Sequence, residues 1–363
     1  MNKKEMINAL ATTGAYLDQH ATGTPLNSDV VKELNGRFFD AFEQIIINES
    51  THNGWFTEKN VRSALGAVAQ SLKNDQLHKW MKRYPRLPVA SDSSVTIGVV
   101  MAGNIPLVGF HDMLSVIMSG HKFLGKPSSK DDRLLKMVAE IIYAIEPGFR
   151  DRIVFTEGYL TDVDGIIATG SNNTSRYFEY YFREMPHIIR RNRNGVAVLS
   201  GNETGEQLMK LGDDIFFYFG LGCRNITKIY VPEDYKPEIL LKALENYPGL
   251  YEHHKYNNNL DYNRSVYLMN QVPFLDNGIL LLKEDERIAS PVGVVYFEKY
   301  LQLNNLIDKL VGLGDQIQCV VSAIEGIENS IMPGDSQFPE LWDYADGIDT
   351  MNFLTELKSS NDL

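Results

Sequence analysis

The stretch Val-Thr-Ile-Gly-Val-Val-Met, residues 95–101, decides the fold class. It is short, largely apolar and rich in β-branched residues, and the turn sequence Ala-Gly-Asn-Ile-Pro ends it at residues 102–106. Apolar residues at helical spacing then run from Leu107 to Met118. A strand that is apolar along its length is typical of a sheet covered on both faces. The stretch therefore predicts the first strand and helix of a parallel α/β unit.

The alternation of strand and helix continues downstream. Apolar β runs are predicted at residues 121–125, 152–155 and 165–169, and an apolar helical face runs from Leu134 to Ile145. Asp131 and Asp132 are expected to open this helix, because negative charge is favourable at a helix N-terminus. Strands that alternate with helices in this way predict a parallel sheet with helices on both faces.

Four residues follow the carboxyl ends of these strands, where ligands of parallel sheets bind. They are Asn104, Lys126, Gly170 and Ser171. A glycine-serine turn before a helix can hold a phosphate, and a lysine beside it could meet ribose hydroxyls or phosphate. Each residue also has a plain structural interpretation, as a turn residue, a solvated strand end or a helix start. The sequence contains no G-x-G-x-x-G fingerprint,.

A second α/β passage begins after Gly195. A β run at 196–199 leads to a helix expected from about Thr204 to Phe219, and a strand resumes at 226–232. Between them Cys223 follows two glycines, which would let a substrate carbonyl approach the backbone,. Cys223 is therefore either an acyl-forming nucleophile or a buried structural cysteine. The aromatic residues 216–219 fit either an apolar acyl channel or a buried helix face.

Composition limits the class of function. A chain of 363 residues suggests two domains,, and a net charge of -12 gives no global attraction for nucleic acid or an anionic membrane surface,. The two cysteines, Cys223 and Cys319, are too few for a disulfide framework, which favours a cytoplasmic protein,. No signal peptide or membrane span is expected. The pair His253-His254 lacks further ligands, so we expect a solvent loop and no metal site,.

Four collinear motifs and a tail carry a resemblance to a known family. The motifs are Asn104-Ile105-Pro106, Lys126-Pro127-Ser128, Thr169-Gly170-Ser171 and Gly222-Cys223, and the tail is Trp-Asp-Tyr-Ala-Asp-Gly at 342–347. In this order they resemble the aldehyde dehydrogenase superfamily. Within it the chain is most similar to the acyl-CoA reductases typified by the fatty acid reductase of bacterial bioluminescence operons. The resemblance is clearest between Val95 and Val231.

The resemblance implies an aldehyde dehydrogenase-like architecture of two α/β domains. Residues 1–195 would form N-terminal helices and a Rossmann-like NAD(P)-binding domain, and residues 196–330 a catalytic domain that carries the nucleophilic cysteine. Residues 331–363 would form a tail that packs back on the cofactor domain or lies at an oligomer interface. Members of the superfamily are commonly dimers or tetramers, so a homodimer or homotetramer is expected.

The resemblance also assigns roles to individual residues. Cys223 would be the nucleophile, and Asn104 would donate its side-chain amide to the oxyanion beside the Cys223 backbone N–H. The cofactor would be NADPH or NADH. Its adenosine ribose would lie on Lys126, its pyrophosphate at the helix opened by Gly170 and Ser171, and a 2′-phosphate near Ser128 and Ser129.

Two departures from the family pattern carry information. Residues 189–195, Ile-Arg-Arg-Asn-Arg-Asn-Gly, contain no carboxylate where hydrolytic members have Glu-Leu-Gly-Gly. Without a positioned base, water competes poorly for a thioester, so exchange with a thiol is expected. Arg190, Arg191 and Arg193 could bind phosphates of CoA or NADPH, or could be solvated or paired with carboxylates. Arg287 stands where a glutamate usually holds the nicotinamide ribose, and the adjacent Glu286 is the expected substitute.

The resulting hypothesis is NAD(P)H-dependent reduction of an acyl-CoA to an aldehyde through an acyl group on Cys223, with an acyl-transferring protein as a possible partner. Three alternatives stay open on the sequence alone. They are a dehydrogenase of the same superfamily that uses aldehydes or acyl phosphates, a cysteine acyltransferase or thioesterase without a cofactor, and a non-catalytic binding subunit.

Overall fold

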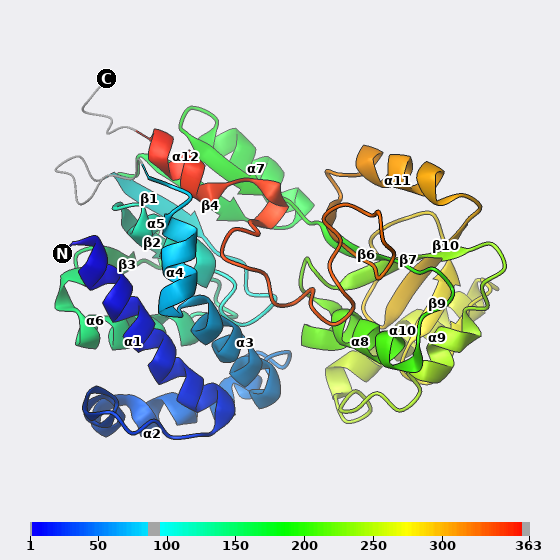
Figure 1. The fold of residues 1–363 in the computed structure, drawn as a ribbon, viewed down its shortest axis with the longest axis horizontal. Coiled ribbons are helices and arrows are strands. Elements are labelled where there is room, and N and C mark those ends of the chain that lie inside the picture. The colour runs from blue at the N-terminus through cyan, green and yellow to red at the C-terminus, as the bar shows by residue number, and fades with distance from the viewer. Residues whose placement is uncertain (1, 86–94, 358–363) are drawn as a thin grey trace. The chain divides into compact units, whose positions relative to one another are not determined.

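The computed structural model describes residues 2–85 and 95–357. The chain begins with helices that pack on one another (Figure 1). These are α1 (Lys3–Thr22), α2 (Asp29–His52), α3 (Glu58–Ser71) and α4 (Asn74–Met81). Asn2 and Glu5 form a reciprocal capping box at the start of α1, and the Ser28 and Thr57 side chains cap α2 and α3. These caps satisfy N–H groups that a helix leaves without partners at its first turn.

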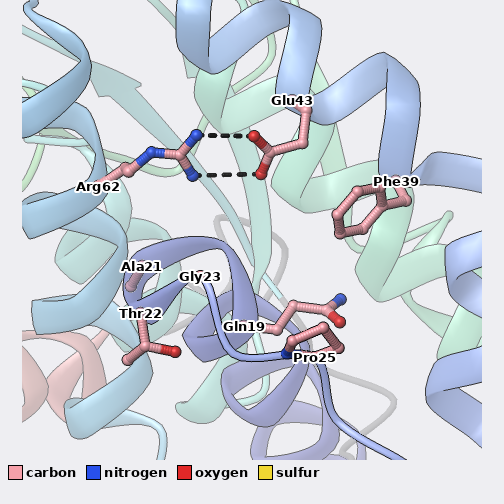
Figure 2. A pocket seen from close by; sticks show the side chains of 8 residues that line it. All are labelled: Gln19, Ala21, Thr22, Gly23, Pro25, Phe39, Glu43 and Arg62. Carbon is pink, nitrogen blue, oxygen red and sulfur yellow. Dashed lines mark hydrogen bonds and ion pairs between the residues drawn. The ribbon is translucent and has the colours of Figure 1, made fainter.

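A polar node joins α1, α2 and α3. Arg62 Nη2 lies 2.7 Å from Glu43 Oε2, and His20 Nδ1 lies 2.6 Å from Glu43 Oε1. The hydrogen bond from Arg62 is the main cause that lowers the pKa of the Glu43 carboxyl, whereas burial lowers the pKa of His20. Arg62 and Glu43 line a cavity of about 280 Å³, and Figure 2 shows this pair among the other side chains that line it. Arg62 and Glu43, the two charged side chains that line this cavity, are thus already engaged with one another.

The first sheet is wholly parallel, as the sequence predicts. Its order is β3-β2-β1-β4-β5, and every neighbouring pair runs in the same direction. The strands are β1 (Thr96–Val100), β2 (Lys122–Lys126), β3 (Ile153–Phe155), β4 (Gly165–Thr169) and β5 (His187–Arg190). The connecting segments contain α5 (Phe110–Met118), α6 (Leu134–Ile145), the short η1 (Pro147–Phe149) and α7 (Asn172–Phe182). The arrangement is Rossmann-like.

One expected helix start is wrong. Asp131 and Asp132 do not open α6, which begins at Leu134. Asp131 is buried, and its Oδ2 accepts the backbone N–H of Leu107 at 2.8 Å. Burial raises the pKa of this carboxyl to about 7. The carboxylate therefore serves a neighbouring loop and not the helix dipole.

The second sheet contains mainly parallel strands in the order β11-β6-β7-β10-β9-β8. They are β6 (Asn194–Val198), β7 (Ile226–Pro232), β8 (Leu275–Asp276), β9 (Leu281–Glu284), β10 (Val294–Tyr300) and β11 (Ile317–Val321). Only β8 and β9 pair in antiparallel fashion among the described strands. The accompanying helices are α8 (Gly205–Phe216), α9 (Glu238–Ala243), α10 (His254–Met269) and α11 (Leu303–Gly312). Val196, Val198 and Tyr230 pack with Leu306 and Leu310 of α11 in the core of this layer.

The interpretation of His253 and His254 as a solvent loop is wrong. His253 caps α10, because its Nδ1 accepts the Tyr256 backbone N–H at 3.0 Å. Its ring also stacks on Phe219 with centroids 3.8 Å apart. The imidazole is thus a structural cap, a role that the adjacent pair of histidines conceals in the sequence.

The described chain forms two compact units. The first comprises the residues up to Arg191 together with those from Glu340, and the second comprises Asn192–Pro339. The sequence predicts limits at 195 and 330. The difference at the second limit has a local cause, because Gly334 and Ser336 donate backbone N–H groups to the buried Asp214 of α8. No helix among the described residues is long and apolar enough to cross a membrane.

The C-terminal segment from Glu340 completes the first unit. It contains η3 (Ala345–Gly347) and α12 (Thr350–Glu356). His111 Nε2 donates to the Leu341 carbonyl at 2.9 Å, and His121 Nε2 donates to the Leu354 carbonyl at 2.8 Å. Met351 and Leu354 are fully buried. The tail is therefore part of the first unit's core.

Candidate active site

The first unit brings its predicted site residues to one edge of its sheet. In the register of the parallel strands, Val100 of β1 lies opposite Lys126 of β2 and Ala168 of β4. The segments that leave these three strands carry Asn104, Ser128 and Ser129, and the turn Gly170-Ser171. Asn104, Ser129 and Ser171 are exposed, and Lys126, Ser128 and Gly170 are half-buried. This is the ligand-binding edge of a parallel sheet.

The loops after β1 and β2 touch closely. A Cβ atom on Gly103 would lie 2.6 Å from Ser128 Oγ and 2.8 Å from Ser128 Cβ. The Met101 N–H also donates to the Lys126 carbonyl at 3.1 Å. Only glycine at position 103 permits this approach without a shift of one loop. Asn104 is thereby held beside the segment that carries Ser128 and Ser129.

The turn after β4 opens α7 as predicted. Ser171 is the N-cap residue, and its Oγ accepts the Thr174 backbone N–H at 3.3 Å. A Cβ on Gly170 would lie 3.0 Å from Thr174 Cβ and 3.1 Å from the Phe178 ring, so the turn sits close against the helix. An N-terminus of this kind, beside a lysine at the neighbouring strand end, fits the phosphates of a dinucleotide.

Cys223 lies in the second unit, between the short helix η2 (Phe217–Gly220) and β7, and its side chain is half-buried. The turn before it is strained. Tyr218, Phe219 and Gly220 have φ values of 50°, 59° and 76°. Two successive aromatic residues in the left-handed region cost free energy and persist only where their surroundings enforce them. Such strain is concentrated at functional sites.

Asn225 provides this enforcement, and sequence reasoning missed it. The residue is fully buried. Its Oδ1 accepts the Gly222 N–H at 2.7 Å, and its Nδ2 donates to the carbonyls of Asp214 at 3.0 Å and Phe217 at 2.9 Å. The available signal was a single amide at the start of an apolar strand, since a buried polar group must find partners. The side chain fixes both ends of the turn that presents Cys223.

The two cysteines have different surroundings. Cys319 of β11 is buried, and burial raises the pKa of its thiol to about 12. Its Sγ lies 3.7 Å from the Arg224 carbonyl oxygen. The approach of β6 to this loop is also close, because a Cβ on Gly195 would lie 2.7 Å from the Arg224 oxygen and 2.9 Å from the Asn225 oxygen. Cys319 therefore stays a protonated thiol at neutral pH, and Cys223 is the more accessible sulfur.

Phe216, Tyr218 and Phe219 of the aromatic run before Cys223 are packed in the core of the second unit. Phe216 lies 4.6 Å from the ring of Tyr247, and Phe219 stacks on His253. Phe216, Tyr218 and Phe219 are all buried. These contacts favour the buried helix face over the apolar channel for these side chains.

Arg287 and Glu286 follow β9 in the same unit as Cys223. Arg287 donates through Nε and Nη2 to Asp285 at 2.9 and 2.6 Å, and its guanidinium lies 5.1 Å from the centre of the Tyr296 ring. The Arg287 hydrogen bond is the main cause that lowers the pKa of the Asp285 carboxyl. Glu286 is exposed. Arg287 is thus engaged with its own loop.

The arginines of residues 189–195 are also engaged. Arg190 is buried and donates through Nη1 to Asp112 of α5 at 2.6 Å and through Nη2 to Thr350 at 3.0 Å. Arg191 pairs with Glu179 of α7, and Arg193 donates to the Gly314 carbonyl at 3.0 Å. Arg190 and Arg191 thus pair with carboxylates.

Comparison with known proteins identifies the architecture. No protein-family model matches the sequence, and no curated protein matches it. Solved structures do match the fold. Aldehyde dehydrogenase 21 from Physcomitrella patens, in complex with the reaction product succinate, aligns with a TM-score of 0.62 at 12% identity over 99% of this chain and 90% of its own. The fold is that of the aldehyde dehydrogenases.

Two further aldehyde dehydrogenases share this fold. The NAD-dependent enzyme from Sinorhizobium meliloti aligns with a TM-score of 0.62 at 12% identity, over 88% of this chain and 71% of its own. Succinic semialdehyde dehydrogenase from Streptococcus pyogenes, in complex with NADP+, aligns with a TM-score of 0.58 at 14% identity, over 88% and 78%. In this aldehyde dehydrogenase fold, Asn104 and the residues at the sheet edge belong to the first unit, and Cys223, Glu286 and Arg287 belong to the second.

Proposed function

We propose that this protein reduces an acyl-CoA thioester to an aldehyde with NADPH or NADH, through an acyl group carried on Cys223. The observation that carries the proposal is the half-buried Cys223 thiol on a strained turn that Asn225 holds in place. The aldehyde dehydrogenase fold supports an oxidoreductase that acts on aldehydes, since its solved members include NAD- and NADP-dependent enzymes.

The residues at the edge of the first sheet fit a dinucleotide. The close Gly170-Ser171 turn would receive the pyrophosphate at the start of α7, and Lys126 would meet the adenosine ribose,. Ser128 and Ser129 would lie near a 2′-phosphate. When bound, the nicotinamide would supply the hydride that reduces the acyl group.

The chain's own residues account for the transfer of the acyl group. Cys223 would attack the thioester carbonyl as its thiolate, so that a new carbon–sulfur bond forms at Cys223 and the bond to CoA breaks, with CoA leaving as its thiolate. The Asn104 amide and the Cys223 backbone N–H would donate to the oxyanion that develops. Exchange between two thioesters is nearly isoenergetic, so positioning and charge stabilisation are the main requirements.

The segment 189–195 supports a site that disfavours hydrolysis. It contains no carboxylate, and the side chain of Arg190 is held by Asp112 and Thr350. No residue of this segment can therefore activate water as a general base. The acyl group would persist on Cys223 until hydride or another thiol removes it.

A comparison of substrates tests this function. The protein would be given acyl-CoA or acyl phosphate together with NADPH or NADH, and free aldehyde together with the oxidised cofactor. Cofactor absorbance and the amount of free CoA are followed in each reaction. The proposal predicts that acyl-CoA is the acyl substrate that is used, and that oxidation of the cofactor and release of CoA then occur together. Release of CoA without a change in the cofactor would show an acyltransferase or thioesterase, and turnover only with acyl phosphate would contradict the proposal. A protein inert to every substrate and unable to retain an acyl group would be a binding subunit.

Aldehyde oxidation is the second candidate. The named solved neighbours favour it, because they are aldehyde dehydrogenases and one of them holds succinate as its reaction product. Incubation with an aldehyde and oxidised cofactor, with and without CoA, separates the two. Formation of free acid without CoA would support oxidation, whereas formation of acyl-CoA only when CoA is present would support the acyl-CoA reductase.

A further inference from the structure

The end of α2 meets both loops that carry predicted site residues in the first unit. Asn53 is the C-cap residue of this helix and is 6% exposed. Its Nδ2 donates to the Gly103 carbonyl at 3.4 Å, in the loop after β1, and to the Lys130 carbonyl at 3.2 Å, in the loop after β2. One buried amide thus bridges two loops that lie far from it in the sequence.

The bond to Gly103 bears directly on Asn104. The Gly103 carbonyl belongs to the same planar peptide unit as the Asn104 N–H, so a donor on that oxygen sets the orientation of the backbone that enters Asn104. The bond to Lys130 acts similarly on the segment that follows Ser128 and Ser129. We propose that Asn53 is a positioning residue that holds the oxyanion donor and the cofactor-binding loop in one fixed relation, an inference that rests on the proposed function.

An amide is the group that this position needs. Asn53 Oδ1 accepts the Trp55 N–H at 3.1 Å, while both carbonyl contacts require a donor. An aspartate would keep the first bond and lose the other two. Both carbonyls would then lose the donor that the buried Asn53 side chain supplies,.

The surrounding contacts hold the loops at other points. His52 Nε2 donates to the Ser129 carbonyl at 3.0 Å, and Asp131 accepts the Leu107 N–H at 2.8 Å. His52 contacts only the loop after β2, whereas Asp131 lies in that loop and joins it directly to the loop after β1. Asn53 differs from both, because it ties the two loops to the end of α2. Loss of the Asn53 amide is therefore expected to release both loops from α2 and to leave the Asp131–Leu107 bond as the remaining side-chain link between them.

The test compares wild type with Asn53→Asp and with Asn48→Asp as a matched control. Asn48 lies on the same helix and is exposed, and its Nδ2 donates only within α2, to the Gln44 carbonyl at 2.8 Å and to Gln44 Oε1 at 3.2 Å. Two readouts are taken on the full chain. Amide hydrogen exchange is measured in peptides that cover residues 101–109 and 126–133, and the rate of acylation of Cys223 by acyl-CoA is measured in a single turnover.

We expect faster exchange in both loops of Asn53→Asp and an acylation rate about 10- to 100-fold lower, because small misplacements of catalytic groups have effects of this size. Asn48→Asp should match wild type in both measurements. If Asn53→Asp does not fold, Asn53→Ser replaces it, since its hydroxyl cannot donate to both carbonyls.

Unchanged exchange in either loop would overturn the proposal, and so would faster exchange with an unchanged acylation rate. If wild type itself is never acylated, the proposed function fails. In that case, amide hydrogen exchange in the two loops still shows by itself whether Asn53 bridges them.

Discussion

Single residues set the chemistry available to the two sulfurs. Burial keeps Cys319 protonated, while Asn225 holds the half-buried Cys223 at the end of a strained turn. The sequence predicts Cys223 as a candidate because glycines stand beside it. It does not predict Asn225, because the burial of that amide depends on carbonyls from α8 and the turn, which only the folded chain brings together.

Asp131 leads to a pH-dependent prediction. Its pKa is raised to about 7, chiefly by burial, with Glu49 and Asp132 adding negative charge and the Leu107 N–H opposing the shift. The pKa of this carboxyl is higher in the folded chain than its ordinary value of 3.8. Below pH 3.8 the group is protonated in both the folded and the unfolded chain and does not lower the free energy of unfolding,. Its destabilising effect grows as pH rises from about 4 to 7 and is constant above.

Asp131→Asn should remove this effect, because the amide stays neutral and its oxygen can still accept the Leu107 N–H. The variant is expected to gain stability at pH 8 relative to pH 4, by up to a few kcal/mol, since one pKa unit corresponds to about 1.4 kcal/mol. Urea unfolding at a series of pH values measures the difference. Asp308→Asn, at an exposed position of α11, serves as the control. A stability difference that does not vary between pH 4 and 7 would contradict the assignment.

At the scale of elements, β6 and the Cys223 loop depend on a glycine. A Cβ at Gly195 would meet two backbone oxygens, those of Arg224 and Asn225, at 2.7 and 2.9 Å. Backbone atoms cannot rotate away as a side chain can, so Gly195→Ala should displace the loop. The variant is expected to lose about 1–3 kcal/mol of stability and most of its acylation rate.

Gly36→Ala is the matched comparison. Gly36 lies in α2, and a Cβ atom added there would meet no atom of the described residues within 4 Å. The substitution should therefore stabilise the helix by about 0.5–1 kcal/mol. Chemical denaturation and single-turnover acylation of both variants provide the measurement. Equal stability of the two alanine variants would show that the contact between β6 and the loop is not tight.

Some helices and strands of the first unit can be predicted from the sequence, and others cannot. The apolar strands β1 and β4 and the capped helix α7 were predicted, because their patterns are local. The strand β5 was missed, since its only apolar residues are Ile188 and Ile189, and it ends in Arg190. This charge is buried only because Asp112, far away in the sequence, compensates it. Pairings of this kind leave no local signal.

At the scale of the whole molecule, both ends of the described chain contribute to the first unit. Trp80 Nε1 of α4 donates to Tyr344 Oη at 2.7 Å, and Tyr84 Oη lies 2.7 Å from the same oxygen and donates to Asp349 at 2.8 Å. These bonds join residues that are more than 250 positions apart in the sequence. The tail after Glu340 is accordingly expected to fold together with the N-terminal helices.

Tyr344→Phe tests this connection. It removes the oxygen that accepts the buried Trp80 N–H, and an unsatisfied buried donor costs about 1–3 kcal/mol. Guanidinium unfolding followed by tryptophan fluorescence should show a loss of this size. Tyr262→Phe, at a side chain that is 68% exposed, should change stability by less than about 0.5 kcal/mol. Equal effects of the two substitutions would rule out a stabilising role for the tail contact.

The acyl group on Cys223 is the central claim, and the intact mass of the protein after brief exposure to acyl-CoA without cofactor tests it most directly. Wild type and Cys319→Ala should each gain the mass of one acyl group, Cys223→Ala should gain none, and Asn104→Ala should gain it about 100- to 1,000-fold more slowly, as expected for the loss of an oxyanion donor. Addition of NADPH or NADH should then remove the mass and release aldehyde. An acyl group retained by Cys223→Ala, or never found on wild type, would contradict the account.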